Sequence, residues 1–365
     1  MRLFRPNIEK LQSSGNIIGL AKILADHDPE LRRMAVGVLE RLADARVVEQ
    51  LLPYVADADT SIRRSVVSIL ERIGDPRALS GFCQALEDTD VGVRRSASSA
   101  LAKIGDAQAI DSLIRALSDR DPHVRRNAAR GLEKYGGSRV VPSMVHSLSD
   151  SDVGVRRYAA SALSKFATED DGESLATALR DTDSLVRESA ACGLERVGKS
   201  GAVDDLILAL NDEYTTVRIH ATKALARIGD ARGAEPLIAL IEGADPLVAG
   251  HAAIALAKIG DERAVEPLIR FLKEGSANIR LNAAKTLGEI GDTRAVQAMT
   301  QALKDYDYDV CVAVAIGLER IKRKNLATMN SVATPPEPVK AMTSVSNPNP
   351  EEEAIPASNS GVAQK

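Results

Sequence analysis

The residues best suited to chemistry in this chain are arginines and aspartates that recur at intervals of 31 residues. Six of the arginines have an aspartate four positions earlier, which places both side chains on one face of a helix and within reach of each other. We predict that these pairs form a structural ladder that fixes how repeated units stack. The alternative is a row of binding sites for phosphate or carboxylate groups. The ladder residues are Asp28, Arg32, Asp59, Arg63, Asp90, Arg94, Asp121, Arg125, Asp152, Arg156, Asp183 and Arg187.

A second arginine directly follows the ladder arginine in the first five units. We assign it no acid at a fixed offset, and the helical angle turns it toward solvent. These side chains are therefore expected to form a basic row, which is either simply solvated or a docking strip. A docking strip would accept an acidic partner or the chain's own Glu351 to Glu353. The row consists of Arg33, Arg64, Arg95, Arg126 and Arg157.

From the seventh unit on, the chain loses the regular Asp–Arg pairs, and at the position of the basic row its second half reads Glu188, Ile219, Gly250, Leu281 and Val312. An exposed apolar strip on an elongated protein would be a partner-binding site. The alternatives are that these units are atypical because they cap the stack, or that the C-terminal tail covers the strip. The candidate partner-binding residues of this half are Ile219, Ile254, Leu281, Val312 and Ile316.

Other chemical signals are weak. The segment from Gly193 to Ser200 matches the phosphate-binding pattern GxxxxGKS, but Gly193 falls in the middle of a predicted helix and Gly198 at its end, whereas a phosphate loop needs a preceding strand. His220 and His251 share one position in neighbouring units, about 10 Å apart by ordinary helix spacing, which is too far for one metal ion. The three cysteines have no histidine at a fixed offset. We therefore predict no catalytic, cofactor-binding or metal-binding residues.

The elements that carry these residues follow from the period. Ten branched aliphatic residues from Leu31 to Val310 are spaced by 31, and a leucine stands eight positions after each of them, from Leu39 to Leu318. A fixed period of this length indicates stacked supersecondary units. The sequence therefore predicts one elongated solenoid of ten units rather than several globular domains.

Each unit is expected to be a pair of helices. In residues 245–272, apolar residues are spaced by three and four, which is helical periodicity. Asp245 is placed to cap a helix with Pro246 at its first position, and Gly260 is placed to end it. The Asp and Arg that follow open a second, shorter helix. We expect the first short helix at about 16–24 and the last long helix at about 308–321.

Composition narrows the function. The net charge is −4 and tryptophan is absent, which argues against a nucleic-acid-binding protein. No stretch approaches the length of a membrane span, no signal peptide is visible, and three widely spaced cysteines suggest the reducing cytoplasm. We expect a monomer with an N-terminal cap (1–13), a solenoid (14–322) and a disordered tail rich in Pro, Ser and Glu (323–365).

The repeated pattern, seen in Asp183–Arg187 and in Leu225–Asp230, resembles HEAT repeats, in particular the short kind named after phycobilisome lyase subunits. The likeness covers roughly 14–322. It implies an all-α, right-handed solenoid whose second helix in each pair lines the concave side, and it would place the apolar strip on that side.

What the resemblance implies for function is a scaffold or adaptor that binds another protein or a peptide segment and has no catalysis of its own. The alternative is an enzyme or enzyme subunit on the same repeats, similar to bilin lyases or to deoxyhypusine hydroxylase. The hydroxylase binds iron through His-Glu dipeptides, and this sequence contains none. The sequence does not identify the partner.

Overall fold

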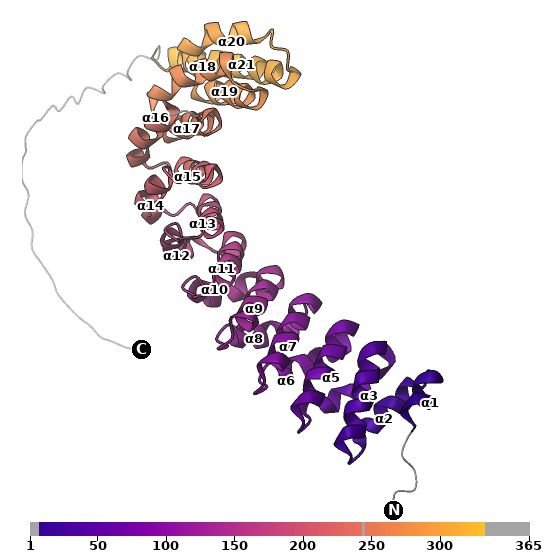
Figure 1. Cartoon of the computed structure of the whole chain (residues 1–365). Helices are drawn as coiled ribbons and strands as arrows, with labels where there is room; N and C mark the ends of the chain where they lie inside the picture. The colour runs from indigo at the N-terminus through magenta and orange to yellow at the C-terminus, as the bar shows by residue number, and fades with distance from the viewer. Residues whose placement is uncertain (1–6, 243–244, 333–365) are drawn as a thin grey trace, which may run out of the picture.

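The computed structural model describes residues 7–242 and 245–332, and these form a long, curved stack of helices (Figure 1). Every regular element in the described ranges is an α-helix or a 3-10 turn. The predicted all-α solenoid is therefore confirmed. None of the described helices is long and apolar enough to cross a membrane.

The long helices line the inner side of the curve, and most begin at an aspartate. Asp245, for example, accepts hydrogen bonds from the backbone N–H groups of Leu247 and Val248 with Pro246 in the first turn, and Gly260 ends the helix with a φ of 88°. The long helices are α3 (Pro29–Leu42), α5 (Thr60–Ile73), α7 (Val91–Ile104), α9 (Pro122–Tyr135), α11 (Val153–Phe166), α13 (Ser184–Val197), α15 (Thr215–Ile228), α17 (Pro246–Ile259), α19 (Ala277–Ile290) and α21 (Tyr308–Val332).

The short helices lie on the outer side (Figure 1). Most follow a 3-10 turn, and in several units an aspartate such as Asp261 caps that turn by accepting from the N–H of Arg263. The short helices are α1 (Ile8–Ser13), α2 (Ile17–Lys22), α4 (Val48–Leu51), α6 (Leu79–Ala85), α8 (Ile110–Ala116), α10 (Val141–Ser147), α12 (Gly172–Ala178), α14 (Val203–Ala209), α16 (Ala234–Ile241), α18 (Val265–Glu274) and α20 (Val296–Ala302).

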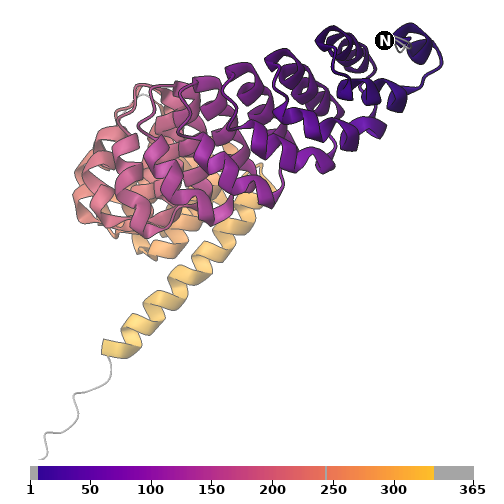
Figure 2. The ribbon, with the colours of Figure 1, turned by 90° about the horizontal axis from the view of Figure 1, so that it is seen from below.

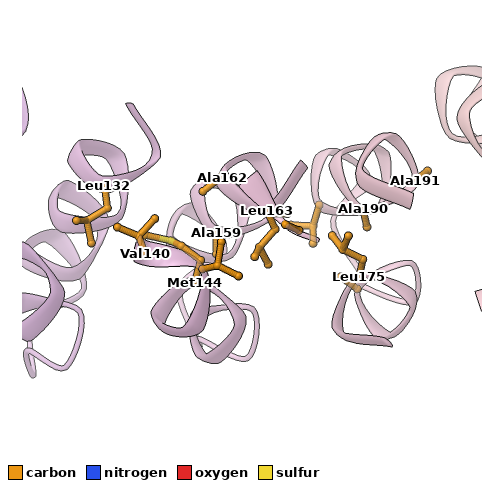
Figure 3. Packing of buried hydrophobic residues seen from close by; sticks show 14 of the residues in the cluster. Leu132, Val140, Met144, Ala159, Ala162, Leu163, Leu175, Ala190 and Ala191 are labelled. Atoms are coloured by element: carbon orange, nitrogen blue, oxygen red, sulfur yellow. The ribbon is translucent and has the colours of Figure 1, made fainter. Parts of the chain in front are cut away.

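The core runs as one layer between the two rows of helices. Leu163 of α11 lies between Met144 of α10 and Leu175 of α12, and Ala159 and Ala190 let neighbouring long helices approach closely (Figure 3). All five side chains are buried. Small residues at the helix contacts explain how the chain fills its core with few aromatic rings.

The C-terminal end departs from the prediction. Helix α21 continues past Ile321 to Val332 and projects from the stack (Figure 2). The sequence from Leu318 to Thr334 contains no glycine or proline, so nothing of the kind that ends the other helices is present. Lys324 also donates to the last carbonyls of α19, including that of Ile290 at 3.1 Å. The prediction of disorder is therefore wrong for 323–332, and the rest of the predicted tail lies outside the described residues.

Candidate functional site

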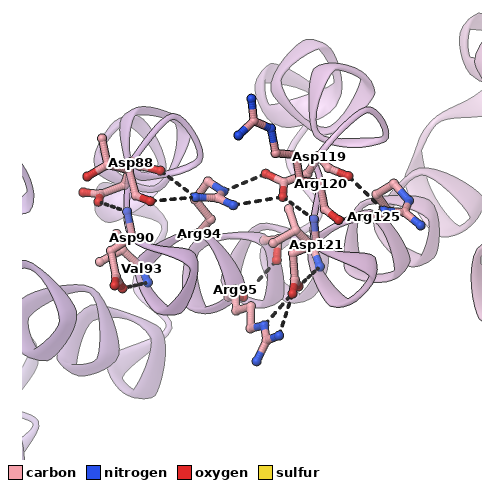
Figure 4. Close-up of polar contacts among 12 residues, drawn as sticks. Asp88, Asp90, Val93, Arg94, Arg95, Asp119, Arg120, Asp121 and Arg125 are labelled. Carbon is pink, nitrogen blue, oxygen red and sulfur yellow. Dashed lines mark hydrogen bonds and ion pairs between the residues drawn. The ribbon is translucent and has the colours of Figure 1, made fainter. Parts of the chain in front are cut away.

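We had predicted from the sequence that each ladder arginine pairs with the aspartate four positions earlier. This prediction is wrong. Arg94 instead reaches the next unit, where its Nε and Nη2 atoms donate to Asp119 at 2.7 and 3.1 Å, and its Nη1 atom donates to the carbonyl of Asp88 at 2.9 Å (Figure 4). The same contact, 25 residues apart, joins seven pairs of units. The pairs are Arg32–Asp57, Arg63–Asp88, Arg94–Asp119, Arg125–Asp150, Arg156–Asp181, Arg187–Asp212 and Arg280–Asp305.

The predicted pairing fails because the aspartate at that position caps its own helix. Asp121 accepts hydrogen bonds from the N–H groups of His123 and Val124 at the start of α9, and its carboxylate also faces the preceding unit. There it binds Arg95, a member of the row that we had described as lacking a matched acid (Figure 4). That description is wrong for all five members. The pairs are Arg33–Asp59, Arg64–Asp90, Arg95–Asp121, Arg126–Asp152 and Arg157–Asp183.

Each junction in the first half thus holds two arginine–aspartate pairs of different depth. The inner pair is nearly enclosed, with 16% of the Arg94 side chain and 11% of the Asp119 side chain exposed. In the outer pair the arginine, such as Arg95, is about half exposed. Because each arginine of the predicted basic row already has a carboxylate, the row presents few unpaired positive charges to an acidic partner.

The outer pairs predict a defined acid sensitivity. The hydrogen bond from Arg95 lowers the pKa of Asp121 to about 2, and Arg64 lowers that of Asp90 to about 2. A pKa depressed in the folded state gives stability that is present above the unfolded value of about 4 and lost as the pH falls through about 2. In Asp121→Asn, which keeps the helix cap, the free energy of unfolding should fall by about 1 kcal/mol less between pH 7 and pH 2.5 than in the unaltered protein. Urea unfolding followed by circular dichroism measures the free energy of unfolding between pH 7 and 2.5. The same dependence on pH in the variant and in the unaltered protein would contradict the assignment.

The predicted apolar strip is divided between separate places on the inner face. Leu281, Val312 and Ile316 line one hollow of about 490 Å³ between α19 and α21, which we call the apolar hollow. Val312 is 39% exposed and Ile316 is 50% exposed. Ile254 lines a second hollow, and Ile219 on α15 lines neither of the two. The strip is therefore discontinuous, with its apolar centre in the last two units.

The second hollow, of about 440 Å³, lies between α13, α15, α17 and α19 and is rich in cations; we call it the cationic hollow. Lys223, Arg227 and Lys258 line it together with Ile254 and a half-buried His251. Burial and the neighbouring Lys223 ammonium lower the pKa of His251, so its imidazole is neutral at pH 7. This site was not predicted from the sequence, because Lys223 and Lys258 occupy different positions of the repeat and converge only when units stack.

The apparent phosphate-binding segment is helical, as predicted. Gly193 lies inside α13, and Leu194 and Val197 are buried. Gly198 ends the helix with a φ of 73°. Within the described ranges, no group of three or more His, Cys, Asp or Glu side chains has the arrangement to hold a metal ion.

Helix pairs stacked along a curve define an α-solenoid of the helical-repeat class. The family described as HEAT repeats matches the chain over residues 17–98, 79–164, 114–195, 172–244 and 234–319, and the chain belongs to this family. No curated protein sequence matches it significantly. Among solved structures, the crystal structure of an engineered protein is similar, with a TM-score of 0.59 and 23% identity over 84% of this chain and 99% of the other. At that identity the likeness concerns the fold alone.

Proposed function

We propose that this protein is an interaction scaffold that binds another protein along its inner face and acts in the cytoplasm as a monomer. The observation that carries the proposal is the apolar hollow. It gathers Leu281, Val312 and Ile316 from two long helices at a point where the side chains stay partly exposed to solvent. Apolar side chains grouped in a concavity are typical of sites that receive an apolar anchor of a partner.

The remainder of the inner face fits the same role. In the first five units the paired charges of the long helices suit the polar rim of an interface. A further hollow of about 490 Å³ between α9, α11 and α13, lined by Val153, Tyr158 and Leu185, offers a second place for an apolar anchor. The repeat fold gives a rigid, extended surface whose units contact only their neighbours. We propose the domain limits 14–322 for this surface, with α1 as its N-terminal cap.

A pair of charged substitutions tests the proposal. In Leu281→Asp/Ile316→Asp, a carboxylate in the apolar hollow should weaken binding of the partner by at least about 30-fold, the effect of losing a central apolar anchor. Affinity purification with quantitative mass spectrometry, followed by titration with the purified partner, measures the loss. Circular dichroism should show unchanged helical content.

The matched control is Leu208→Asp, which places the same charge on a 63% exposed leucine of the outer helix α14. This variant should bind the partner as the unaltered protein does. Equal binding by all three proteins would show that the apolar hollow is not the partner site.

A further inference from the structure

One position of the long helix alternates between lysine and isoleucine through the last four units. The residues are Lys223 on α15, Ile254 on α17, Lys285 on α19 and Ile316 on α21, each 31 positions after the one before. The first six units carry other residues at this position, and none of them repeats the alternation. They are Gly37, Ser68, Ser99, Arg130, Ser161 and Cys192.

These four side chains belong to the two hollows. Lys223 and Ile254 line the cationic hollow, and Lys285 and Ile316 line the apolar hollow. The hollows adjoin on α19, where Leu281 faces one and the next residue faces the other. The two hollows therefore follow one another along the inner face of α15 to α21 and together, as what we call the groove, present alternating cationic and apolar positions.

Three lysines of this groove, Lys223, Lys258 and Lys285, have no acidic partner among the residues that the structure describes. In two earlier units a lysine near the end of the long helix contacts an acid of the preceding unit: Lys103 contacts Glu71 at 3.0 Å, and Lys165 contacts Glu133. Lys258 occupies the same position, but Ala226 stands where the acid would be. Lys223 and Lys285 form no ion pair or hydrogen bond within 7–242 and 245–332.

The groove is lined by more cations than acids: Lys223, Arg227, Lys258, Lys285 and Arg320 against Glu195, Glu289 and Asp309. Glu195 accepts a hydrogen bond from His220 at 2.7 Å, and Glu289 lies 3.9 Å from Arg320. Asp309 lies at the far edge of the apolar hollow, on the first turn of α21. An unpaired ammonium in a partly enclosed hollow attracts a carboxylate more strongly than one on an open surface.

We propose that the partner's bound segment is an acidic peptide in which carboxylate and apolar side chains alternate, the carboxylates on Lys223 and Lys285 and the apolar groups on Ile254 and Ile316. This rests on the proposed function and specifies its partner. Neighbouring helices are about 8–10 Å apart, which matches one turn of a polyproline II chain, in which three residues rise about 3.1 Å each and every third side chain lies on the same face. The groove therefore selects an acidic residue and an apolar residue in turn at every third position.

The test uses the full chain and a fluorescein-labelled synthetic peptide that repeats Glu-Ser-Ser-Leu-Ser-Ser, with binding followed by fluorescence anisotropy. Peptides with Lys in place of Glu, or Ser in place of Leu, should bind at least about tenfold more weakly. Lys223→Glu/Lys285→Glu should weaken binding of the acidic peptide at least about tenfold and strengthen binding of the lysine peptide. Lys273→Glu, on the outer helix α18, makes the same charge change away from the groove and should leave both affinities unchanged.

The outcomes separate this inference from the proposed function. If Leu281→Asp/Ile316→Asp loses the partner but Lys223→Glu/Lys285→Glu binds every peptide unchanged, the scaffold stands and the acidic specificity is overturned. The chain's own Glu351 to Glu353 offer the competing occupant. If changing these three residues to glutamine in the full chain raises the affinity for the acidic peptide more than about tenfold, this segment rather than a partner occupies the groove.

Discussion

Asp119→Ala should lower the free energy of unfolding by about 3 kcal/mol, the cost of leaving a nearly enclosed charge without its partner. Asp119 receives two hydrogen bonds from Arg94, and the N–H of Asp121 donates to it at 2.8 Å. The alanine variant removes all three. Urea unfolding followed by circular dichroism measures the loss, and we expect it to appear as an earlier transition of the units on either side of this junction.

Two further variants identify the cause. Asp111→Ala, in the outer helix of the same region, removes a carboxylate that contacts Arg139 while both side chains are more than half exposed, and it should cost less than about 0.5 kcal/mol. Arg94→Met/Asp119→Leu should recover most of the stability, because an apolar pair leaves no buried charge. Similar losses for Asp119→Ala and Asp111→Ala would show that the junction pair adds no more than a surface pair.

Gly288→Val should detach the last helix from the stack. A β-carbon on Gly288 would lie 2.5 Å from the Cα atom of Gly317, so the clash is with backbone and no change of rotamer relieves it. Overpacking of this kind costs about 3 kcal/mol. Because α19 and α21 form the apolar hollow, the variant should also lose partner binding. Limited proteolysis with mass spectrometry should show early cleavage within α21.

Gly201→Val is the matched control, since a β-carbon there meets no atom within 4 Å and the backbone is not left-handed. It should unfold and resist proteolysis as the unaltered protein does. If Gly288→Val behaves in the same way, the close approach of α19 and α21 does not hold the last helix in place.

The period of 31 was enough to predict the solenoid, the helix caps and the buried apolar positions, because these depend on local spacing within a unit. Asp245, Pro246 and Gly260 take the roles that their types predict. The ion pairs could not be assigned from spacing within a helix, because Asp121 faces both its own helix and the preceding unit. The outer pairs could have been predicted from the constant offset of 26 between Arg95 and Asp121, which is repeated in five units.

The candidate site was predicted in part. Leu281, Val312 and Ile316 do meet in one hollow, whereas Ile219 stands apart from it. The cationic hollow was not foreseen, because its lining comes from four long helices and depends on how the units rotate along the curve. The end of α21 was misplaced because the prolines from Pro335 on and the acidic run Glu351 to Glu353 were taken to mark the whole segment after 322 as disordered, although no glycine or proline stands between Leu318 and Thr334.

The repeated junctions of the first half make that half modular. The contacts from Arg63 to Asp88 and from Arg64 to Asp90 recur with the same donor and acceptor atoms through the fifth unit, so each of these units offers the next the same ion-pairing groups. Deleting or duplicating one whole unit would preserve these two arginine–aspartate pairs at each junction. The protein could thereby acquire a shorter or longer arm in fixed increments while the groove at its far end kept its chemistry.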